Sequence, residues 1–430
     1  MAELANELGK PLSAAWGRRH LVIVLCAIAV LIAYTDRVNM SVAAVAMRGQ
    51  FGWNQEVKGT VLASFFVGYL LCMLPAGWLA NRHGGRRVLA GAVVWWSAFT
   101  ILTPLAASVS VNALIAARIG LGMGEAAMMP AAYGLFAHWV PARERTRATA
   151  FLLSGISLGQ VAGFAATGAL TQHFGWQLSF YLFGVLGLAW SAIWLKNVRE
   201  RPVDDSRMAA AERALFAKPS TLKPSAGAAA WRLLARRPQV WAYIFTHFAT
   251  TWSLYMLLSW LPSYFREALG LSIQSAGLYA AAPWLVNLVV SNSVAYAADK
   301  LVERGSRLLV VRRTLIVGGL LGLAFFLLAL RDVRSPELAL ALICVATGFL
   351  AFITCGLAPN TLEIAPNHAS LLMGISNTIA TLPGVFGVVV TGWLIQVTGT
   401  YAAAFLVAAG VAIAAGLVYL RYGGTEPVDM

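Results

Sequence analysis

Twelve apolar stretches, each of about 20 residues or more, recur from one end of the chain to the other. They begin near residues 20, 57, 86, 109, 145, 175, 238, 273, 307, 335, 366 and 400. Each is long enough to cross a hydrocarbon core of ~30 Å. Lipid offers no hydrogen bonds to the backbone, so continuous apolar runs of this length are helices. The chain is therefore predicted to be an all-α membrane protein with twelve transmembrane helices.

The composition and the placement of charge agree with this prediction. The 430 residues are 59% hydrophobic and 12% charged, whereas a soluble domain carries about 25% charged residues. The net charge of +14 does not indicate a nucleic-acid partner, because most Lys and Arg lie before the first stretch and after the even-numbered ones. This positive-inside pattern predicts that both termini lie on the inner side of the membrane. The outer loops are expected to keep only Arg48, Lys58, Arg266, Arg331 and Arg334.

One long polar segment, residues 197–237, divides the apolar stretches six and six. Its prolines and scattered charges predict an inner linker with one surface helix near residues 207–217. The expected organisation is an inner N-terminus (1–19), a first six-helix bundle (20–196), the linker, a second bundle (238–422) and an inner tail (423–430).

The two halves echo each other in sequence. Gly77 to Arg87, after the second stretch, resembles Ala295 to Arg307 after the eighth, and Gly155-Ile-Ser in the fifth stretch recurs as Gly374-Ile-Ser in the eleventh. A duplicated six-helix unit around a site at the membrane midplane is how many secondary transporters are built, and rocking of the halves gives alternating access. The sequence therefore predicts two pseudo-symmetric halves.

Four charged residues lie inside apolar stretches, where charge is costly. Asp36 and Arg37 belong to the first stretch, and Arg118 and Glu125 to the fourth. Seven helical steps return Glu125 to within ~20° of Arg118, about 10 Å further along the axis. Two cations and two acids sum to zero, which suits a site where arginines hold an anion and acids hold protons. A structural ion pair between two helices remains the alternative.

Other polar residues in the stretches are candidates for contacts with a solute. Asn39 lies one turn after Asp36, and Tyr69 and Tyr255 lie deep in the second and seventh stretches. Hydrogen bonds between helices are the alternative for the amide and hydroxyl side chains. The candidates in the second half, which suit the hydroxyls of a sugar acid, are Asn360, Asn377, Thr378 and Thr381.

Several segments in the same order resemble the major facilitator superfamily, and within it the anion:cation symporter family. That family includes bacterial sugar-acid permeases, plastid phosphate transporters, sialin and vesicular glutamate carriers. The matching segments are Asp36 to Ala43, Gly77 to Arg87, Arg118 to Glu125, Trp139 to Arg145, Leu258 to Phe265 and Glu363 to Thr378. The resemblance covers essentially the whole chain and implies the twelve-helix fold.

The resemblance also implies roles for individual residues. Arg37 would bind the anion, Asp36 and Glu125 would carry protons, and Arg118 would orient the acids. Residues on the inner side would form a gate between the halves, although Asn81 stands where the family usually has Asp. The expected gating residues are Asn81, Arg82, Arg86, Arg87, Glu144, Arg145 and Asp299.

The resemblance leaves the solute open between two classes. Thr250 and Tyr133 stand where vesicular glutamate carriers have Arg and His, which argues against their mechanism. Residues 94–97 and 260–265 are most similar to the plastid phosphate branch, whereas residues 36–43 suit the bacterial permeases equally. Without a transit-type N-terminus, the expectation is a monomeric proton-coupled symporter of a small organic anion (hexonate, hexuronate or aldarate) in a bacterial inner membrane. Inorganic phosphate or another carboxylate, with sodium as coupling ion, is the alternative.

The alternative from a different functional class is an enzyme or a receptor. The four cysteines all lie in apolar stretches without ligand spacing, and no nucleophile constellation stands out. We therefore expect no enzymatic activity, no metal and no cofactor. The expected partners are the solute, protons and the bilayer.

Overall fold

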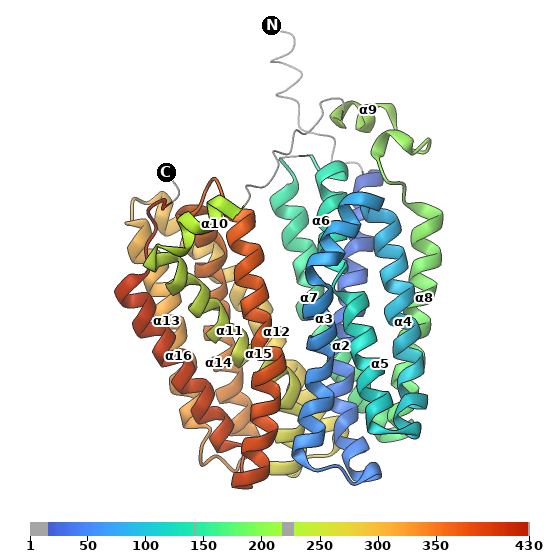
Figure 1. Ribbon diagram of the computed structural model, residues 1–430, viewed down its shortest axis with the longest axis vertical. Coiled ribbons are helices and arrows are strands. Elements are labelled where there is room, and N and C mark those ends of the chain that lie inside the picture. The colour runs from blue at the N-terminus through green and yellow to red at the C-terminus, as the bar shows by residue number, and fades with distance from the viewer. Residues whose placement is uncertain (1–15, 142, 217–227, 429–430) are drawn as a thin grey trace, which may run out of the picture.

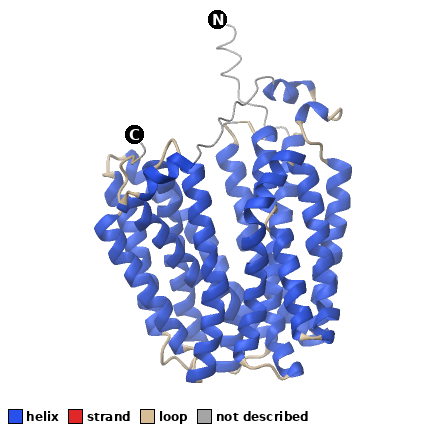
Figure 2. Cartoon of the chain, in the orientation of Figure 1, coloured by secondary structure: helices blue, strands red, loops and turns tan. Residues whose placement is uncertain are grey.

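The computed structural model describes residues 16–141, 143–216 and 228–428, and these residues form helices without a strand. Figures 1 and 2 show the long helices arranged in two bundles that stand side by side. The start of α2 at Arg18, the end of α16 at Tyr422 and the described parts of the linker lie at the same end of the bundles (Figure 1). We call this end the inner face and the opposite end the outer face.

The first bundle contains α2 (Arg18–Phe51), α3 (Gln55–His83), α4 (Gly85–Val109), α5 (Val111–Glu125), α6 (Met128–Trp139), α7 (Arg145–Phe174) and α8 (Trp176–Asn197). The second contains α11 (Pro238–Ser263), continued by the π-helical turn η3 (Tyr264–Ala268), then α12 (Ile273–Glu303), α13 (Leu308–Ala329), α14 (Pro336–Ile364), α15 (Ala369–Thr398) and α16 (Ala402–Tyr422). These starts fall within three residues of the predicted ones. The predicted fold class is confirmed.

Ten of the described helices are long and apolar enough to cross a membrane singly. The remaining two spans are α11 and the pair α5 and α6. The fourth predicted span is broken, because α5 ends at Glu125 and α6 begins at Met128. Pro130 explains the break, since a proline has no N–H for the carbonyl of residue 126 and its ring clashes with that carbonyl. The sequence analysis did not anticipate this break, which places Glu125 at a helix end.

The linker carries short helices on the inner face: η1 (Pro202–Asp204), α9 (Ala210–Arg213), η2 (Ala214–Phe216) and α10 (Ala228–Ala235). The expected surface helix at 207–217 is thus shorter, and the part from residue 217 lies outside the described residues. The helix α10 was not predicted.

Acidic residues attach the linker to the start of α2. Arg18 Nε lies 2.9 Å from Asp205, and Arg19 Nη1 lies 3.1 Å from Glu212. Glu212 also accepts the backbone N–H groups of Arg18 and Arg19. Burial alone would raise the pKa of Glu212, but these hydrogen bonds and the Arg19 charge outweigh it and lower the pKa. The first part of the linker is therefore fastened to the first bundle.

Glycines on α7 allow α2 to pack closely against it, as their four-residue spacing predicts. A Cβ atom at Gly155 would lie 2.6 Å from the Ala27 carbonyl oxygen, and one at Gly159 would overlap the Leu31 carbonyl oxygen. Because these obstacles are backbone atoms, no side-chain movement could relieve them. The alignment of α2, which carries Asp36 and Arg37, depends on this contact.

The two bundles meet close to the outer face. A Cβ at Gly277 of α12 would lie 2.5 Å from the Phe164 carbonyl oxygen of α7, and one at Gly392 of α15 would lie 2.6 Å from the Gln55 carbonyl oxygen of α3. Towards the inner face the helices of the two bundles diverge (Figure 1). The conformation is therefore closed on the outer side.

The α2–α7 contact can be tested with Gly155→Ala. We expect this variant to lose about 1–3 kcal/mol of stability, because an added methyl overpacks a rigid contact. Gly318→Ala is the matched control, since nothing lies within 4 Å of its Cβ position on α13. The control should be neutral or stabilising, as alanine favours helix interiors. Thermal unfolding in detergent measures both, and equal midpoints would contradict the proposed packing.

Candidate functional site

The four charged residues predicted from the sequence come together in the first bundle. Asp36 and Arg37 on α2 are 1% and 7% exposed, and Arg118 and Glu125 on α5 are 2% and 0% exposed. Arg37 Nη2 donates to Glu125 Oε2 at 2.8 Å. Arg118 interacts electrostatically with both Glu125 and Asp36. The ion pair joins two helices, so the geometry also fits the structural alternative.

Much of the hydrogen-bonding capacity of this cluster is unused. Neither carboxylate oxygen of Asp36 has a hydrogen-bond partner among the described residues, and the same holds for Nε and Nη1 of Arg118. The Thr100 hydroxyl lies near Asp36 but donates to the Trp96 carbonyl. Buried charged groups without partners are unfavourable. The cluster is therefore suited to exchange partners, with a solute, an ion or a proton.

Aromatic rings surround the Arg37 guanidinium. Its carbon lies 4.4 Å from the ring centre of Tyr34, 4.7 Å from Phe65 and 5.2 Å from Tyr69. Arg118 lies 5.4 Å from the same Phe65 ring. Tyr34 and Tyr69 are partly exposed, whereas Arg37 is buried. The two rings therefore shield the guanidinium from the surroundings. Cation–π contacts orient a guanidinium without neutralising it.

The sequence analysis singled out Tyr69 but missed Tyr34 and Phe65. Helical spacing contained the signal, because Tyr34 lies three residues before Arg37 and Phe65 lies four residues before Tyr69. Residues three or four apart share a helix face. The sequence spacing could therefore have predicted aromatic residues beside the intramembrane arginine.

The second bundle brings Tyr255 of α11 towards this cluster. Tyr255 interacts electrostatically with Arg37, and its ring centre lies 4.5 Å from that of Phe66 on α3. Its hydroxyl lies near the Thr381 side chain of α15. The Thr381 hydroxyl donates to the Asn377 carbonyl at 2.8 Å. Tyr69 and Tyr255 therefore approach Arg37 from the two bundles, and Thr381 lies beside Tyr255.

Asn377 and Thr378 lie on α15 within one turn of Thr381 and are partly exposed. The Thr378 hydroxyl donates to the Gly374 carbonyl of its own helix at 2.8 Å.

Asn39 has a structural environment rather than a solute-facing one. Its side-chain oxygen accepts hydrogen bonds from Thr167 on α7 at 3.0 Å and from Ser179 on α8 at 2.7 Å. Asn39 is fully buried. It therefore joins three helices, which was the alternative interpretation of its sequence position.

Asn360 is likewise hydrogen-bonded to neighbouring segments. Its amide nitrogen donates to Glu363 at 3.2 Å and to the Gly424 carbonyl at 2.9 Å, and its oxygen accepts from Tyr419 at 3.0 Å. Glu363 also pairs with Arg312 at 2.8 Å. This network fastens the C-terminal segment beneath the second bundle on the inner face. The sequence could not reveal it, because it depends on where the tail folds back.

The expected gating residues of the first bundle have partners within that bundle. The Arg82 guanidinium stacks on Trp78 at 5.1 Å, and Arg86 donates to the Leu195 carbonyl at 2.8 Å. Arg145 donates to the carbonyls of Ala137 and Val140 at the end of α6.

The remaining gating candidates do not connect the bundles either. Glu144 pairs with Arg19 at 2.9 Å, within the first bundle. Asn81 and Asp299 are exposed, and Arg87 lies on the wall of a groove in the first bundle. None of the ion pairs found among the described residues crosses between the bundles at the inner face. The residues expected to form an inner gate therefore do not connect the bundles by ion pairs in this conformation, and their gating role stays a prediction.

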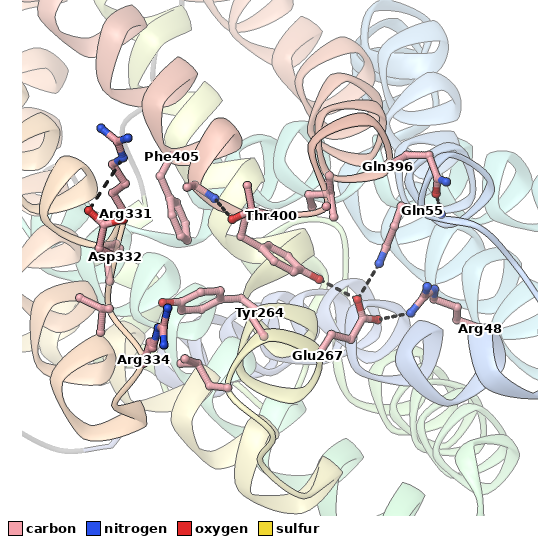
Figure 3. Close-up of a pocket in the computed structure, with 18 residues that line it drawn as sticks. Arg48, Gln55, Tyr264, Glu267, Arg331, Asp332, Arg334, Gln396, Thr400 and Phe405 are labelled. Atoms are coloured by element: carbon pink, nitrogen blue, oxygen red, sulfur yellow. Dashed lines mark hydrogen bonds and ion pairs between the residues drawn. The ribbon is translucent and has the colours of Figure 1, made fainter.

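An unpredicted ion-pair cluster holds the bundles together at the outer face (Figure 3). Glu267 of η3 lies 2.7 Å from Lys58 Nζ and 3.5 Å from Arg48 Nη1. It also accepts hydrogen bonds at 2.8 Å from Gln55 and Tyr401. Three of these partners belong to the first bundle, so a single carboxylate connects both halves.

Lys58 was expected in an outer loop, and that expectation is wrong. It lies in the first turn of α3 and is fully buried. Its ammonium donates to Ser263 at 3.1 Å and lies 4.8 Å from the Trp260 ring. A cavity of about 740 Å³ beside this cluster opens on the outer face, with Arg331, Arg334 and Gln396 in its lining (Figure 3).

Comparison with known proteins identifies the relatives of this chain. The profile of the Major Facilitator Superfamily matches residues 25–369. "Probable anion transporter 4, chloroplastic" of Oryza sativa subsp. japonica is 38% identical over 411 residues, which cover 96% of this chain and 69% of that protein. "Sodium-dependent phosphate transport protein 1, chloroplastic" of Arabidopsis thaliana is 36% identical, with 96% and 80% covered. "Ascorbate transporter, chloroplastic" of Arabidopsis thaliana is also 36% identical, with 96% and 76% covered.

Solved structures show the same fold. A bacterial homologue of the human lysosomal transporter Spinster, in an inward-facing and occupied conformation, superimposes with a TM-score of 0.73 at 18% identity over 95% of this chain and 96% of that one. A D-xylose–proton symporter gives 0.73 at 17% identity over 94% and 98%. At these identities the likeness concerns the fold alone.

The predicted bacterial inner membrane is wrong by this comparison, because the relatives named above are chloroplast proteins of plants. The predicted multi-pass membrane architecture is confirmed. From its profile match and its relatives, the chain belongs to the Major Facilitator Superfamily and is a secondary transporter of anions, not an enzyme.

Proposed function

We propose that this protein transports inorganic phosphate, or an oxyanion of similar size and charge, by alternating access with a coupled cation. The observation that carries the proposal is the buried Arg37–Glu125 ion pair beside the unpartnered Asp36 and Arg118. The sodium-dependent phosphate relative supports this solute over the sugar acid expected from the sequence. The plastid relatives make a plastid membrane the proposed location.

Exchange of anions at Arg37 explains binding. A guanidinium presents a planar pair of donors that matches carboxylate and phosphate oxygens equally well. In this conformation Arg37 holds the carboxylate of Glu125. A phosphate that takes its place keeps the arginine paired, while Arg118 offers two further buried donor atoms.

Charge balance explains coupling. The two arginines and two acids are neutral together, so an added anion leaves the buried cluster negatively charged. Uncompensated charge in the membrane interior is costly. A proton on Glu125 or Asp36, or a sodium ion at their oxygens, restores neutrality. Solute and cation therefore enter together.

The second bundle completes the site when the inner face closes. Tyr255 already lies near Arg37, with Thr381 beside it. Their hydroxyl groups, with Tyr69 from the first bundle, supply neutral donors to oxyanion oxygens. The inner residues from Asn81 to Arg87 and Asp299 would then form the inner latch.

An organic anion of the ascorbate type is the second candidate. The ascorbate-transporting relative favours it, as do the partly exposed amide and hydroxyl groups of Asn377 and Thr378, which suit a polyhydroxylated ring. Phosphate has no apolar face, whereas the rings of Tyr34 and Tyr69 could stack on a flat enediol. Competition of phosphate and ascorbate against each other decides between them.

Binding depends on the geometry of Arg37. We expect Arg37→Lys to raise the Kd for phosphate at least tenfold, because an ammonium keeps the charge but lacks the bidentate fork. Arg331→Gln is the control, since Arg331 is exposed at the outer face and pairs only loosely with Asp332. Isothermal titration of the purified protein with phosphate measures both. An unchanged Kd in Arg37→Lys would remove Arg37 from the binding site.

Coupling depends on Glu125. In proteoliposomes, Glu125→Gln should abolish accumulation of phosphate against its gradient while counterflow exchange continues, because the neutral amide cannot gain or release a cation. Separately imposed pH and sodium gradients identify the coupling ion in the unaltered protein. Glu56→Gln, at an exposed acid on α3, should behave normally. Uphill uptake by Glu125→Gln at the normal rate would leave the ion pair with a structural role only.

The outer cluster should control access from outside. Lys58→Met leaves the carboxylate of Glu267 without its buried cation, a change that costs about 3–5 kcal/mol in comparable buried pairs. We expect the outward-open state to become more populated. In a protein without native cysteines, Val388→Cys reports this, because Val388 is buried beside Trp260 at the closed outer seam.

An impermeant maleimide added from the outer side should label this cysteine at least tenfold faster in Lys58→Met. Arg331→Gln should leave the labelling rate unchanged. Exchange of the two charges, Lys58→Glu with Glu267→Lys, should restore slow labelling. Equal rates in all variants would show that the cluster does not hold the bundles together.

A further inference from the structure

A groove runs along the membrane-facing side of the first bundle, away from the charged cluster. The helices α3 and α4 form its walls, and α5 with the start of α6 forms its floor. In Figure 1 α5 is visible between the ribbons of α3 and α4. The groove encloses about 610 Å³ and its walls include Pro75, Trp78, Leu79, Val88, Trp95 and Met123.

The lining is almost wholly apolar and open to the surroundings. Trp78 and Trp95 are about half exposed, at 58% and 48%, although both are large apolar side chains. Gly91 keeps the groove open, because no atom lies within 4 Å of the position its Cβ would occupy. In a bilayer such a groove is filled by the hydrocarbon chains of lipids. From Arg87 to Trp95 it follows α4 for about 12 Å, the length of the upper part of an acyl chain.

The end of the groove at the inner face is basic. His83, the last residue of α3, and Arg87, in the first turn of α4, both line it. Arg82 stacks on Trp78 at the same end. The nearby acid, Glu200, is occupied by the backbone N–H groups of Gly85 and Arg86. Arg87 forms no ion pair within the described part of the chain.

We propose that this groove binds one diacyl lipid with an anionic headgroup, a phosphodiester or a sulfonate. One acyl chain lies between α3 and α4, and the headgroup oxygens contact Arg87 and His83, with Arg82 at the rim. Basic residues at this depth attract anionic lipids of the adjacent leaflet. A zwitterionic lipid would place its own cation beside these residues. A second copy of this chain would bring an equally basic inner edge to the contact.

Native mass spectrometry of the purified full-length protein tests the proposal. The probes are phosphatidylglycerol and phosphatidylcholine with identical acyl chains. We expect one phosphatidylglycerol to bind at least tenfold more tightly than phosphatidylcholine. Arg87→Gln should remove this preference while leaving phosphatidylcholine binding unchanged. Inorganic phosphate should not displace the lipid, because the acyl chain supplies part of the binding.

Two leucine variants distinguish lipid binding in the groove from general contact of lipid with the protein surface. Gly91→Leu fills the groove and should lose the bound phosphatidylglycerol. Gly410→Leu is the matched control, an exposed glycine on α16 with equally free surroundings, and should keep it. Thermal unfolding in lipid-free detergent should be alike for both, which shows that Gly91→Leu folds.

Four results would overturn the proposal. The first is retention of phosphatidylglycerol by Gly91→Leu, and the second is equal binding of the two lipids by the unaltered protein. The third is displacement by phosphate alone, which would indicate a free-anion site. A dimer peak that disappears in Gly91→Leu would instead assign the groove to a second copy.

Discussion

The ion pair between Arg37 and Glu125 is the interaction on which the rest of the site depends. Two opposite charges in the interior of a membrane protein are tolerated only while each keeps a partner, because removing either leaves an uncompensated buried charge. The pair therefore joins α2 to α5. In the proposed transport cycle, a solute that binds Arg37 replaces Glu125, and a coupled cation becomes the new partner of the Glu125 carboxylate.

The contacts between the two bundles differ between the two faces of the protein. At the outer face, glycine backbones cross at van der Waals distance and Glu267 collects four polar partners. At the inner face, Arg82 and Arg86 of the Gly77 to Arg87 segment have partners only in their own bundle among the described residues. A buried ion pair depends on direction and distance more than apolar contact does. The outer cluster therefore adds a specific contact to the close packing of the outer face.

Much of the fold and the four charged residues of the candidate cluster were predictable from the sequence. The helix starts followed from hydrophobic length, and Asp36, Arg37, Arg118 and Glu125 followed from the cost of charge within apolar stretches. Lys58 escaped notice because it lies only three residues into its helix, where sequence alone does not separate loop from span. For Asn39 and Asn360 the structure shows hydrogen bonds to neighbouring segments, and their expected contact with a solute stays a prediction. An amide in a span serves a solute or another helix equally well, and only the neighbouring helices decide which.

The sequence by itself determined the number of apolar spans, where they begin and the identity of the charges within the membrane, since these depend on local hydrophobicity and on the free energy of a single side chain in lipid. The tertiary structure decided which charge meets which. It paired Arg37 with Glu125 rather than with its neighbour Asp36, broke the fourth span at Glu125, and brought Lys58 to Glu267 across more than 200 residues. Such pairings depend on how two bundles pack, which is a property of surfaces and not of any one segment.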